Sequence, residues 1–134
     1  MKSIEFRKFI RSYSNLNVKY KSKEPLIEGR TLSKNISATG INIFTTEKLK
    51  KGTTLELEIE LPENHEVIFV KGTVIWQAEV PYSGKGKRSY FSTGIEFTDI
   101  NSATSEKIGH FVFGSLNKYS QEQNGKIIDE LETL

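Results

Sequence analysis

In Leu55-Glu56-Leu57-Glu58-Ile59-Glu60-Leu61, four apolar residues alternate with three glutamates. Successive side chains of a β-strand point to opposite faces, so this stretch predicts a strand with one face in a core and the other in water. The same alternation predicts that Glu56, Glu58 and Glu60 form a solvated row rather than a pair of catalytic carboxylates. The chain is therefore expected to contain a half-buried sheet.

The alternation continues on both sides of this stretch, from about residue 16 to residue 98. Glycine, proline and their polar neighbours interrupt it at regular intervals, as expected for turns. The strands that this pattern predicts are 16–22, 30–37, 40–46, 53–60, 67–79 and 88–98. Short strands joined by regular turns are typical of an antiparallel barrel or sandwich. We therefore predict a mainly β fold.

The apolar residues after Asp99 change to helical spacing and form one stripe, made of Ile108, Phe111, Val112, Leu116 and Tyr119. This spacing predicts a helix over about 103–120 that covers an open end or face of the barrel.

A second, weaker amphipathic segment follows Gly125, where Ile127, Ile128, Leu131 and Leu134 share a side. A segment of this length is too short to be stable as an isolated helix. It therefore packs on its own barrel, pairs with another chain in a homodimer, or frays.

Length and composition indicate one globular domain over residues 1–134, with 36% hydrophobic and 27% charged residues. No apolar run is long enough to span a membrane, and charges occupy the N-terminal positions where a signal peptide would be apolar. We therefore expect a cytoplasmic protein without membrane insertion. The absence of cysteine excludes disulfides, thiolate metal sites and cysteine nucleophiles.

Catalytic and metal chemistry have little support in the sequence. The two histidines, His65 and His110, have no further ligands at metal-binding spacing, so we expect no metal site. No nucleophile and base are paired in a recognisable pattern, and we expect a protein that is not an enzyme.

Charge is distributed unevenly along the chain. Residues 1–52 hold 12 Lys and Arg against 4 Asp and Glu, while residues 53–134 hold 7 against 13. The first part is expected to attract anions, although a solvated basic face has the same composition.

Two short motifs lie in this basic part, Arg7-Lys8-Phe9-Ile10-Arg11 and Asn35-Ile36-Ser37-Ala38-Thr39-Gly40. The planar fork of an arginine suits the O6 and N7 acceptors of guanine, and a second guanidinium can stack on the face of the base. Arg7 and Arg11 would be roughly 13 Å apart in an extended segment, far enough to contact two parts of a dinucleotide. The two motifs together suggest a clamp for a guanine nucleotide.

The pattern RxxxR followed at this distance by (D/N)xSxxG resembles the signature of the PilZ domain, a small bacterial β-barrel whose members often bind cyclic di-GMP. The resemblance extends over roughly residues 5–120 and includes Gly52-Thr53, Gly72-Thr73-Val74-Ile75-Trp76 and Thr93-Gly94-Ile95-Glu96-Phe97. It implies a six-stranded antiparallel barrel with a C-terminal helix. The single PilZ-like domain then divides into an RxxxR arm, a barrel, a helix and an amphipathic tail, over 1–12, 13–100, 101–120 and 121–134.

The resemblance also implies the residues that bind cyclic di-GMP, namely Arg7, Arg11, Asn35, Ser37 and Gly40. In the family pattern the Asx residue accepts hydrogen bonds from the guanine edge, the serine contacts the base or a phosphate, and the glycine allows close approach of the backbone. Many members have aspartate where this chain has Asn35. An amide has one acceptor oxygen and presents a donor to a donor edge, so we expect weaker binding by about 1 kcal/mol.

Two further residues are secondary candidates for the site. Lys8 lies between the two arginines and adds positive charge near the phosphates. Trp76 shares strand parity with Ile68, Val70 and Val74, which predicts packing in the core, and stacking at the mouth of the site is the alternative.

The function implied by the resemblance is that of a cytoplasmic receptor for cyclic di-GMP, without catalysis or any other cofactor. Such a receptor would signal to a protein partner that controls motility, adhesion or exopolysaccharide. One alternative is a PilZ-like adaptor that binds proteins and no nucleotide. A barrel that binds RNA or DNA through its basic part and aromatic residues is a weaker alternative, and we expect no nucleic-acid partner.

Overall fold

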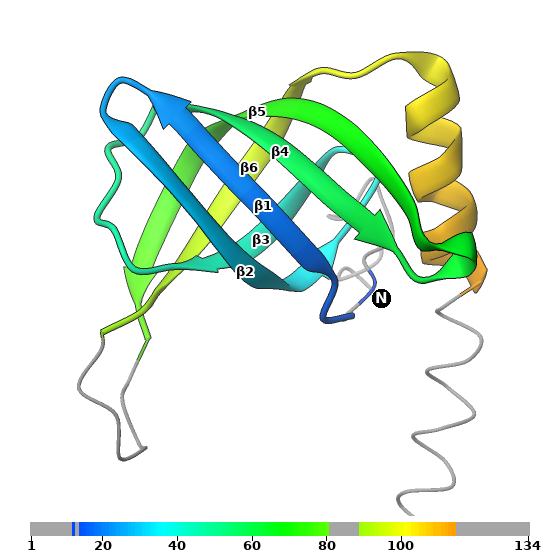
Figure 1. Cartoon of the computed structure of the whole chain (residues 1–134), viewed down its shortest axis with the longest axis horizontal. Helices are drawn as coiled ribbons and strands as arrows, with labels where there is room; N and C mark the ends of the chain where they lie inside the picture. Colours follow the sequence, from blue (N-terminus) through cyan, green and yellow to red (C-terminus); the bar gives the residue numbers. More distant parts are fainter. Residues whose placement is uncertain (1–11, 13, 81–88, 115–134) are drawn as a thin grey trace, which may run out of the picture.

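The computed structural model describes Ser12, residues 14–80 and residues 89–114. Six strands form a closed barrel in the order β1-β2-β3-β6-β5-β4, with every neighbouring pair antiparallel and β4 paired back to β1 (Figure 1). The strands are β1 (Asn17–Lys23), β2 (Leu26–Ile36), β3 (Gly40–Thr45), β4 (Thr54–Leu61), β5 (Glu66–Glu79) and β6 (Phe91–Asp99). A 3-10 helix, η1 (Glu63–His65), joins β4 to β5. The predicted six-stranded antiparallel barrel is confirmed.

The stretch that indicated the fold is strand β4. Its apolar side chains, Leu55, Leu57, Ile59 and Leu61, are buried in the core of the barrel. Burying one such side chain contributes about 1.5–3 kcal/mol, so this alternation is a large part of what fixes the register of β4. The three glutamates between them remain partly exposed on the outer face, as predicted.

The expected start of β2 at residue 30 is wrong, because the strand begins at Leu26. Only Glu24 and Pro25 separate it from β1. Gly29 suggests a turn in the sequence, but it lies within the strand, directly opposite Tyr20. A Cβ at Gly29 would lie 2.6 Å from the Tyr20 ring, so the glycine makes room for a buried aromatic side chain. The other strand boundaries agree closely, except that β6 begins at Phe91 rather than 88.

Residues 102–114 are helical, and the helix lies at one end of the barrel, beside the point where β4 runs into β5 (Figure 1). Asn101 caps its first turn, since the Asn101 side-chain oxygen accepts a hydrogen bond of 2.8 Å from the Thr104 N–H. Three apolar residues of the predicted stripe are buried in the barrel core: Ile108, Phe111 and Val112. The helix therefore covers an end of the barrel.

An ion pair between Lys107 and Glu66 links the helix to the start of β5. The rest of the predicted helix, with Leu116 and Tyr119, and the amphipathic tail over 121–134 lie outside the described residues. Across the described part of the chain, no helix combines the length and apolar character that crossing a bilayer requires.

Tyr20 connects the barrel interior to the loop between β3 and β4. Its hydroxyl donates a hydrogen bond of 2.7 Å to the Glu47 carboxylate. Burial of the phenol, together with its hydrogen bond and proximity to Glu47, raises the pKa of Tyr20 to about 12.

This pKa predicts that Tyr20 contributes to a loss of stability in alkali. The unfolded chain releases the phenol proton near pH 10, whereas the folded chain holds it to about pH 12. The contribution is therefore complete below pH 10 and declines as the pH rises towards 12, by about 2 kcal/mol. Urea unfolding between pH 9 and 12 should show the wild type losing stability relative to Tyr20→Phe as the pH rises. Parallel curves would contradict this assignment.

Candidate functional site

The second sequence motif forms the end of β2, the start of β3 and the turn between them. The Ser37 N–H donates a hydrogen bond of 2.8 Å to the Gly40 carbonyl. The Ser37 hydroxyl oxygen lies 3.3 Å from the Thr39 hydroxyl and accepts a hydrogen bond of 3.3 Å from the Thr39 N–H. Ser37 is almost fully buried. The serine therefore has a structural task in this turn, in addition to the ligand contact implied by the resemblance.

A β-bulge in β2 turns Asn35 to the outer face of the barrel. Ser33 pairs with Ile43 and faces the core, whereas Asn35 pairs with Asn42, so one extra residue lies between them on β2. Without the bulge, Asn35 would share the inward face of Ser33. Bulges re-aim side chains in this way and are frequent beside functional sites.

A second bulge, in β5, turns Trp76 outward as well. Val74 pairs with Ile95, and Trp76 pairs with Gly94, so Ile75 is the extra residue. Val74 is fully buried, while Trp76 is 45% exposed. The prediction that Trp76 packs in the core is therefore wrong. The parity argument failed because the bulge reverses the inward and outward positions within β5.

The exposed indole of Trp76 lies across Gly94 on the neighbouring strand. A Cβ at Gly94 would lie 2.2 Å from the Trp76 ring nitrogen and 2.4 Å from Cε2. On its other side Gly94 pairs with Asn42. Asn35, Asn42, Gly94 and Trp76 are thus register partners across β2, β3, β6 and β5, and we call these four residues the outer-face row.

Polar contacts hold the middle of the outer-face row. The Ser92 hydroxyl donates a hydrogen bond of 2.9 Å to the Asn42 side-chain oxygen. Asn35 and Asn42 are only 7% and 5% exposed although both lie on the outer face. The row therefore combines two well-packed amides with one broad aromatic face, the groups that a protein uses to read a base edge and to stack on a base.

The chain that precedes the barrel reaches it at the same place. Ser12 pairs with Ile36, with the Ser12 N–H 2.8 Å from the Ile36 carbonyl and the Ile36 N–H 2.9 Å from the Ser12 carbonyl. Ile36 lies between Asn35 and Ser37, and Ser12 directly follows Arg11 in the sequence. Arg7, Lys8 and Arg11 themselves lie outside the described residues.

Gly40 has a reason within the barrel to be glycine. It pairs with Glu96 on β6, and a Cβ at this position would lie 2.4 Å from the Ile95 carbonyl oxygen. Any larger residue would push β3 away from β6. The backbone at Gly40, which we expected to lie close to a ligand, therefore lies close to the neighbouring strand β6 in the barrel itself.

Sequence reasoning did not single out Asn42, Ser92 and Gly94 as site residues. The glycine at position 94 could have indicated a site, since an isolated glycine within a strand often marks the close approach of another group. Asn42 carried a weaker signal, as a polar residue between Ile41 and Ile43. Neither signal identifies which residue lies opposite, because that depends on the two bulges.

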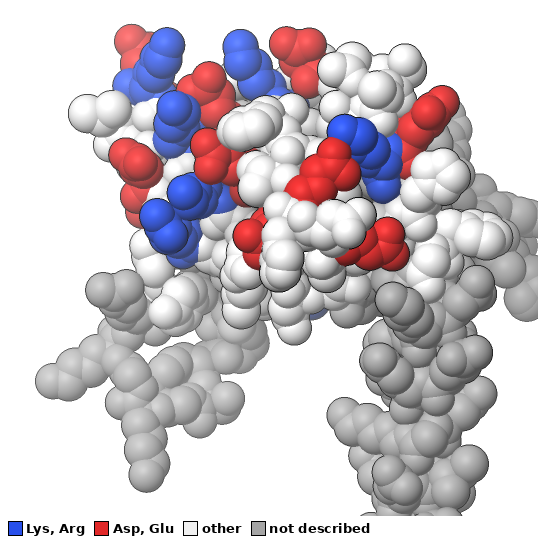
Figure 2. All heavy atoms as spheres, turned by 45° about the vertical axis from the view of Figure 1, so that its right-hand side comes forward, with Lys and Arg blue, Asp and Glu red and all other residues white. Residues whose placement is uncertain are grey.

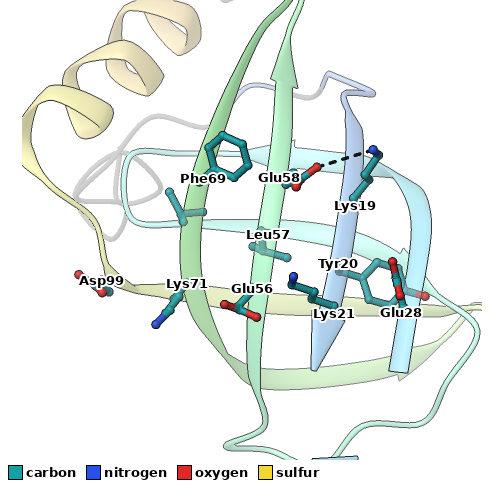
Figure 3. Close-up of a pocket in the computed structure, with 11 residues that line it drawn as sticks. Lys19, Tyr20, Lys21, Glu28, Glu56, Leu57, Glu58, Phe69, Lys71 and Asp99 are labelled. Atoms are coloured by element: carbon teal, nitrogen blue, oxygen red, sulfur yellow. Dashed lines mark ion pairs between the residues drawn. The ribbon is translucent and has the colours of Figure 1, made fainter. Parts of the chain in front are cut away.

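A separate hollow of about 440 Å³ lies on the outer face of β1, β4 and β5 (Figure 3). Charged side chains of both signs line much of it, and the Lys19 ammonium lies 3.8 Å from the Glu58 carboxylate. None of the outer-face row lines this hollow. Exposed pairs of this kind contribute little to stability, and two of the glutamates here, Glu56 and Glu58, belong to the solvated row expected from the sequence.

Lysines, arginines and carboxylates are interspersed on the face shown in Figure 2, rather than gathered into a continuous basic track. Within the described ranges, no group of three or more His, Cys, Asp or Glu residues is placed to hold a metal ion.

Comparison with protein families matches residues 5–114 to the model described as "PilZ domain". Comparison with curated proteins gives no match. Among solved structures, the inhibitor of motility MotI/DgrA from Bacillus subtilis is similar, with 28% identity and a TM-score of 0.68 over 84% of this chain. This chain covers 52% of that protein, or about half of its length.

The similar structures include complexes with cyclic di-GMP. The PilZ domain of YcgR from Escherichia coli, with c-di-GMP, has 12% identity and a TM-score of 0.70, over 88% of this chain and 97% of that one. The MrkH–c-di-GMP complex from K. pneumonia has 14% identity and a TM-score of 0.71, over 87% of this chain and 55% of that one. At these identities the similarity establishes the fold alone.

Proposed function

This chain belongs to the PilZ domain family, and from that premise we propose that it is a receptor for cyclic di-GMP that uses the outer-face row and the RxxxR arm. The observation that carries the proposal is the pairing of Ser12 with Ile36. This pairing places Ser12, the residue after Arg11, beside the second residue of the NxSxxG motif. In this proposal, the arm that joins the barrel at Ser12 brings Arg7 and Arg11 to a ligand held by the motif.

Each group has a distinct task in this proposal. Arg7 and Arg11 bind the guanine edge or stack on a base, and Lys8 adds attraction for the phosphates. Asn35 reads a guanine edge with its amide, and Ser37 contacts a base or phosphate while holding its turn. Trp76 stacks on a base, which the 45% exposure of its side chain permits.

Titration calorimetry of the full chain with cyclic di-GMP, GTP and single-stranded RNA tests this proposal. We expect saturable binding of cyclic di-GMP, and much weaker binding of the other two ligands. Binding of RNA with a steep salt dependence, and no preference for cyclic di-GMP, would favour the nucleic-acid alternative. Absence of cyclic di-GMP binding would overturn the proposal.

We expect Asn35→Asp to strengthen cyclic di-GMP binding and Asn35→Ala to weaken it. A carboxylate offers two acceptor oxygens to the guanine donors, and charge-assisted bonds are about 1 kcal/mol stronger, which corresponds to a few-fold to tenfold in affinity. Repulsion by the ligand phosphates offsets part of this gain. The dissociation constants of the two variants decide the matter.

Asn42→Asp is the matched control for this experiment, because Asn42 is the register partner of Asn35 on the same face. Asn42 lies outside the NxSxxG motif, so a carboxylate there should improve binding less. Weaker binding by Asn35→Asp would mean that the amide of Asn35 donates to the ligand.

A second candidate function is that of an adaptor that inhibits or regulates a protein partner without nucleotide. The 28% identity to the inhibitor of motility MotI/DgrA favours it. Affinity capture with and without added cyclic di-GMP distinguishes the two functions. A receptor should change its partner binding when the ligand is added, whereas a nucleotide-independent adaptor should not.

A further inference from the structure

Gln77, the residue after Trp76 in β5, makes a dense set of hydrogen bonds through its half-buried side chain. Its amide nitrogen lies 3.1 Å from the Thr45 hydroxyl, 3.0 Å from the Thr93 hydroxyl and 2.9 Å from the Glu47 carbonyl. Its oxygen accepts a hydrogen bond of 2.9 Å from the Leu49 N–H. One side chain thus joins β3, β6 and the loop between β3 and β4.

The loop between β3 and β4 depends on the Gln77 side chain more than strands β3 and β6 do. The hydroxyls of Thr45 and Thr93 also contact each other, at 2.9 Å, and Thr45 donates to the Glu47 carbonyl as well, at 3.1 Å. Both threonines therefore retain a partner if Gln77 is removed. The N–H of the buried Leu49 loses the bond that holds it, and a buried donor without a partner is costly.

Gln77 and Trp76 contact neighbouring residues of β6 from opposite faces. The Trp76 indole lies across Gly94, and the Gln77 amide contacts Thr93. Both residues come directly after Ile75, the extra residue of the β5 bulge. A rotation of the β5 backbone that moves the indole must therefore also move the amide, because adjacent strand residues share one peptide unit.

We infer that Gln77 is a positioning residue that holds the Trp76 indole across Gly94 and couples it to the β3–β4 loop. This inference rests on the proposed function where it concerns the ligand: a base stacked on Trp76 stabilises the arrangement that Gln77 supports, and the loop becomes more ordered. The coupling is reciprocal, so loosening the loop weakens ligand binding by the same factor.

The test uses Gln77→Met, which keeps the length of the side chain and removes its hydrogen bonds. Trp76 is the single tryptophan of the chain, so selectively excited tryptophan emission reports its surroundings alone. In ligand-free protein we expect a shifted emission maximum, stronger quenching by acrylamide, and amide exchange of residues 46–50 faster by about tenfold. With cyclic di-GMP, protection of this loop should rise in the wild type and not in the variant.

Thr93→Val is the matched control. It removes a hydroxyl from the same network at nearly constant volume, but three of the four Gln77 contacts, with Thr45, Glu47 and Leu49, remain and still hold the side chain in place. We expect lower stability with tryptophan emission and loop exchange near those of the wild type. If Thr93→Val and Gln77→Met behave alike, general destabilisation explains both and the inference is overturned.

The remaining outcomes separate the inference from the proposed function. Unchanged emission and loop exchange in ligand-free Gln77→Met would overturn the positioning role. Ligand binding without any change in loop exchange would overturn the coupling. If the wild type does not bind cyclic di-GMP, the proposed function and the coupling to ligand both fail, and the ligand-free measurements alone decide the positioning role.

Gln77→Glu keeps the acceptor for the Leu49 N–H, so its emission and loop exchange should fall between those of the wild type and of Gln77→Met. This variant replaces Gln77→Met in the test if Gln77→Met does not fold.

Discussion

Arg7→Ala and Arg11→Ala are each expected to lower the affinity for cyclic di-GMP by at least tenfold, and the double variant by about a hundredfold. Each substitution deletes a charge-assisted contact, which typically contributes about 1.5–3 kcal/mol. Ser12, the residue after Arg11, pairs with Ile36 inside the NxSxxG motif, so the chain that carries the arm joins the barrel at the proposed site. Titration calorimetry at fixed salt measures the loss.

Lys8→Ala is the control in the same segment, since it removes an equal charge without a planar fork. We expect a smaller loss that fades as salt rises, because screening weakens a diffuse attraction more than a bidentate contact. Arginine variants that bind as the wild type would overturn the clamp. A dominant loss at Lys8 would mean that the arm acts through its charge alone.

Alternation was sufficient to predict an antiparallel β fold, a barrel or a sandwich, and the family resemblance added the six-stranded barrel. In β4 each inward residue is apolar and the outward residues are Thr54 and three glutamates, so a shift of one residue would bury the glutamates. Such a pattern permits one register only. The predicted strands 30–37 and 40–46 also placed the turn between β2 and β3, which is held by the hydrogen bond from the Ser37 N–H to the Gly40 carbonyl.

The outer-face row could not be predicted in the same way. Two bulges, one after Ser33 and one after Val74, reverse the parity on which the face of a side chain depends. Each bulge adds one unpaired residue to its strand, here Lys34 in β2 and Ile75 in β5. Both residue types are ordinary in strands, so the sequence carries no strong local signal of the bulge. Parity alone therefore places Trp76 in the core. Pairing between strands, rather than the order along one strand, brings the residues of the row together.

Gly40→Ala and Gly109→Ala make the same chemical change and are expected to have opposite effects on stability. At Gly40 the new Cβ would lie 2.4 Å from the Ile95 carbonyl oxygen, a contact that only a shift between β3 and β6 can relieve. Overpacking of this kind typically costs about 1–3 kcal/mol. Gly109 lies in the helix, where a Cβ would meet no neighbouring group within 4 Å, so alanine should stabilise the protein by about 1 kcal/mol.

Urea unfolding of both variants, paired with cyclic di-GMP titration, separates the two reasons for a glycine at position 40. If the glycine serves β3–β6 packing, stability falls and the remaining folded protein binds less ligand, because Asn42 and Gly94 are neighbours on the same strands. If the glycine only allows the backbone to approach the ligand, the affinity of Gly40→Ala falls while its unfolding midpoint equals that of the wild type. The second result would contradict the packing argument, and a rise in stability at Gly40 would contradict both.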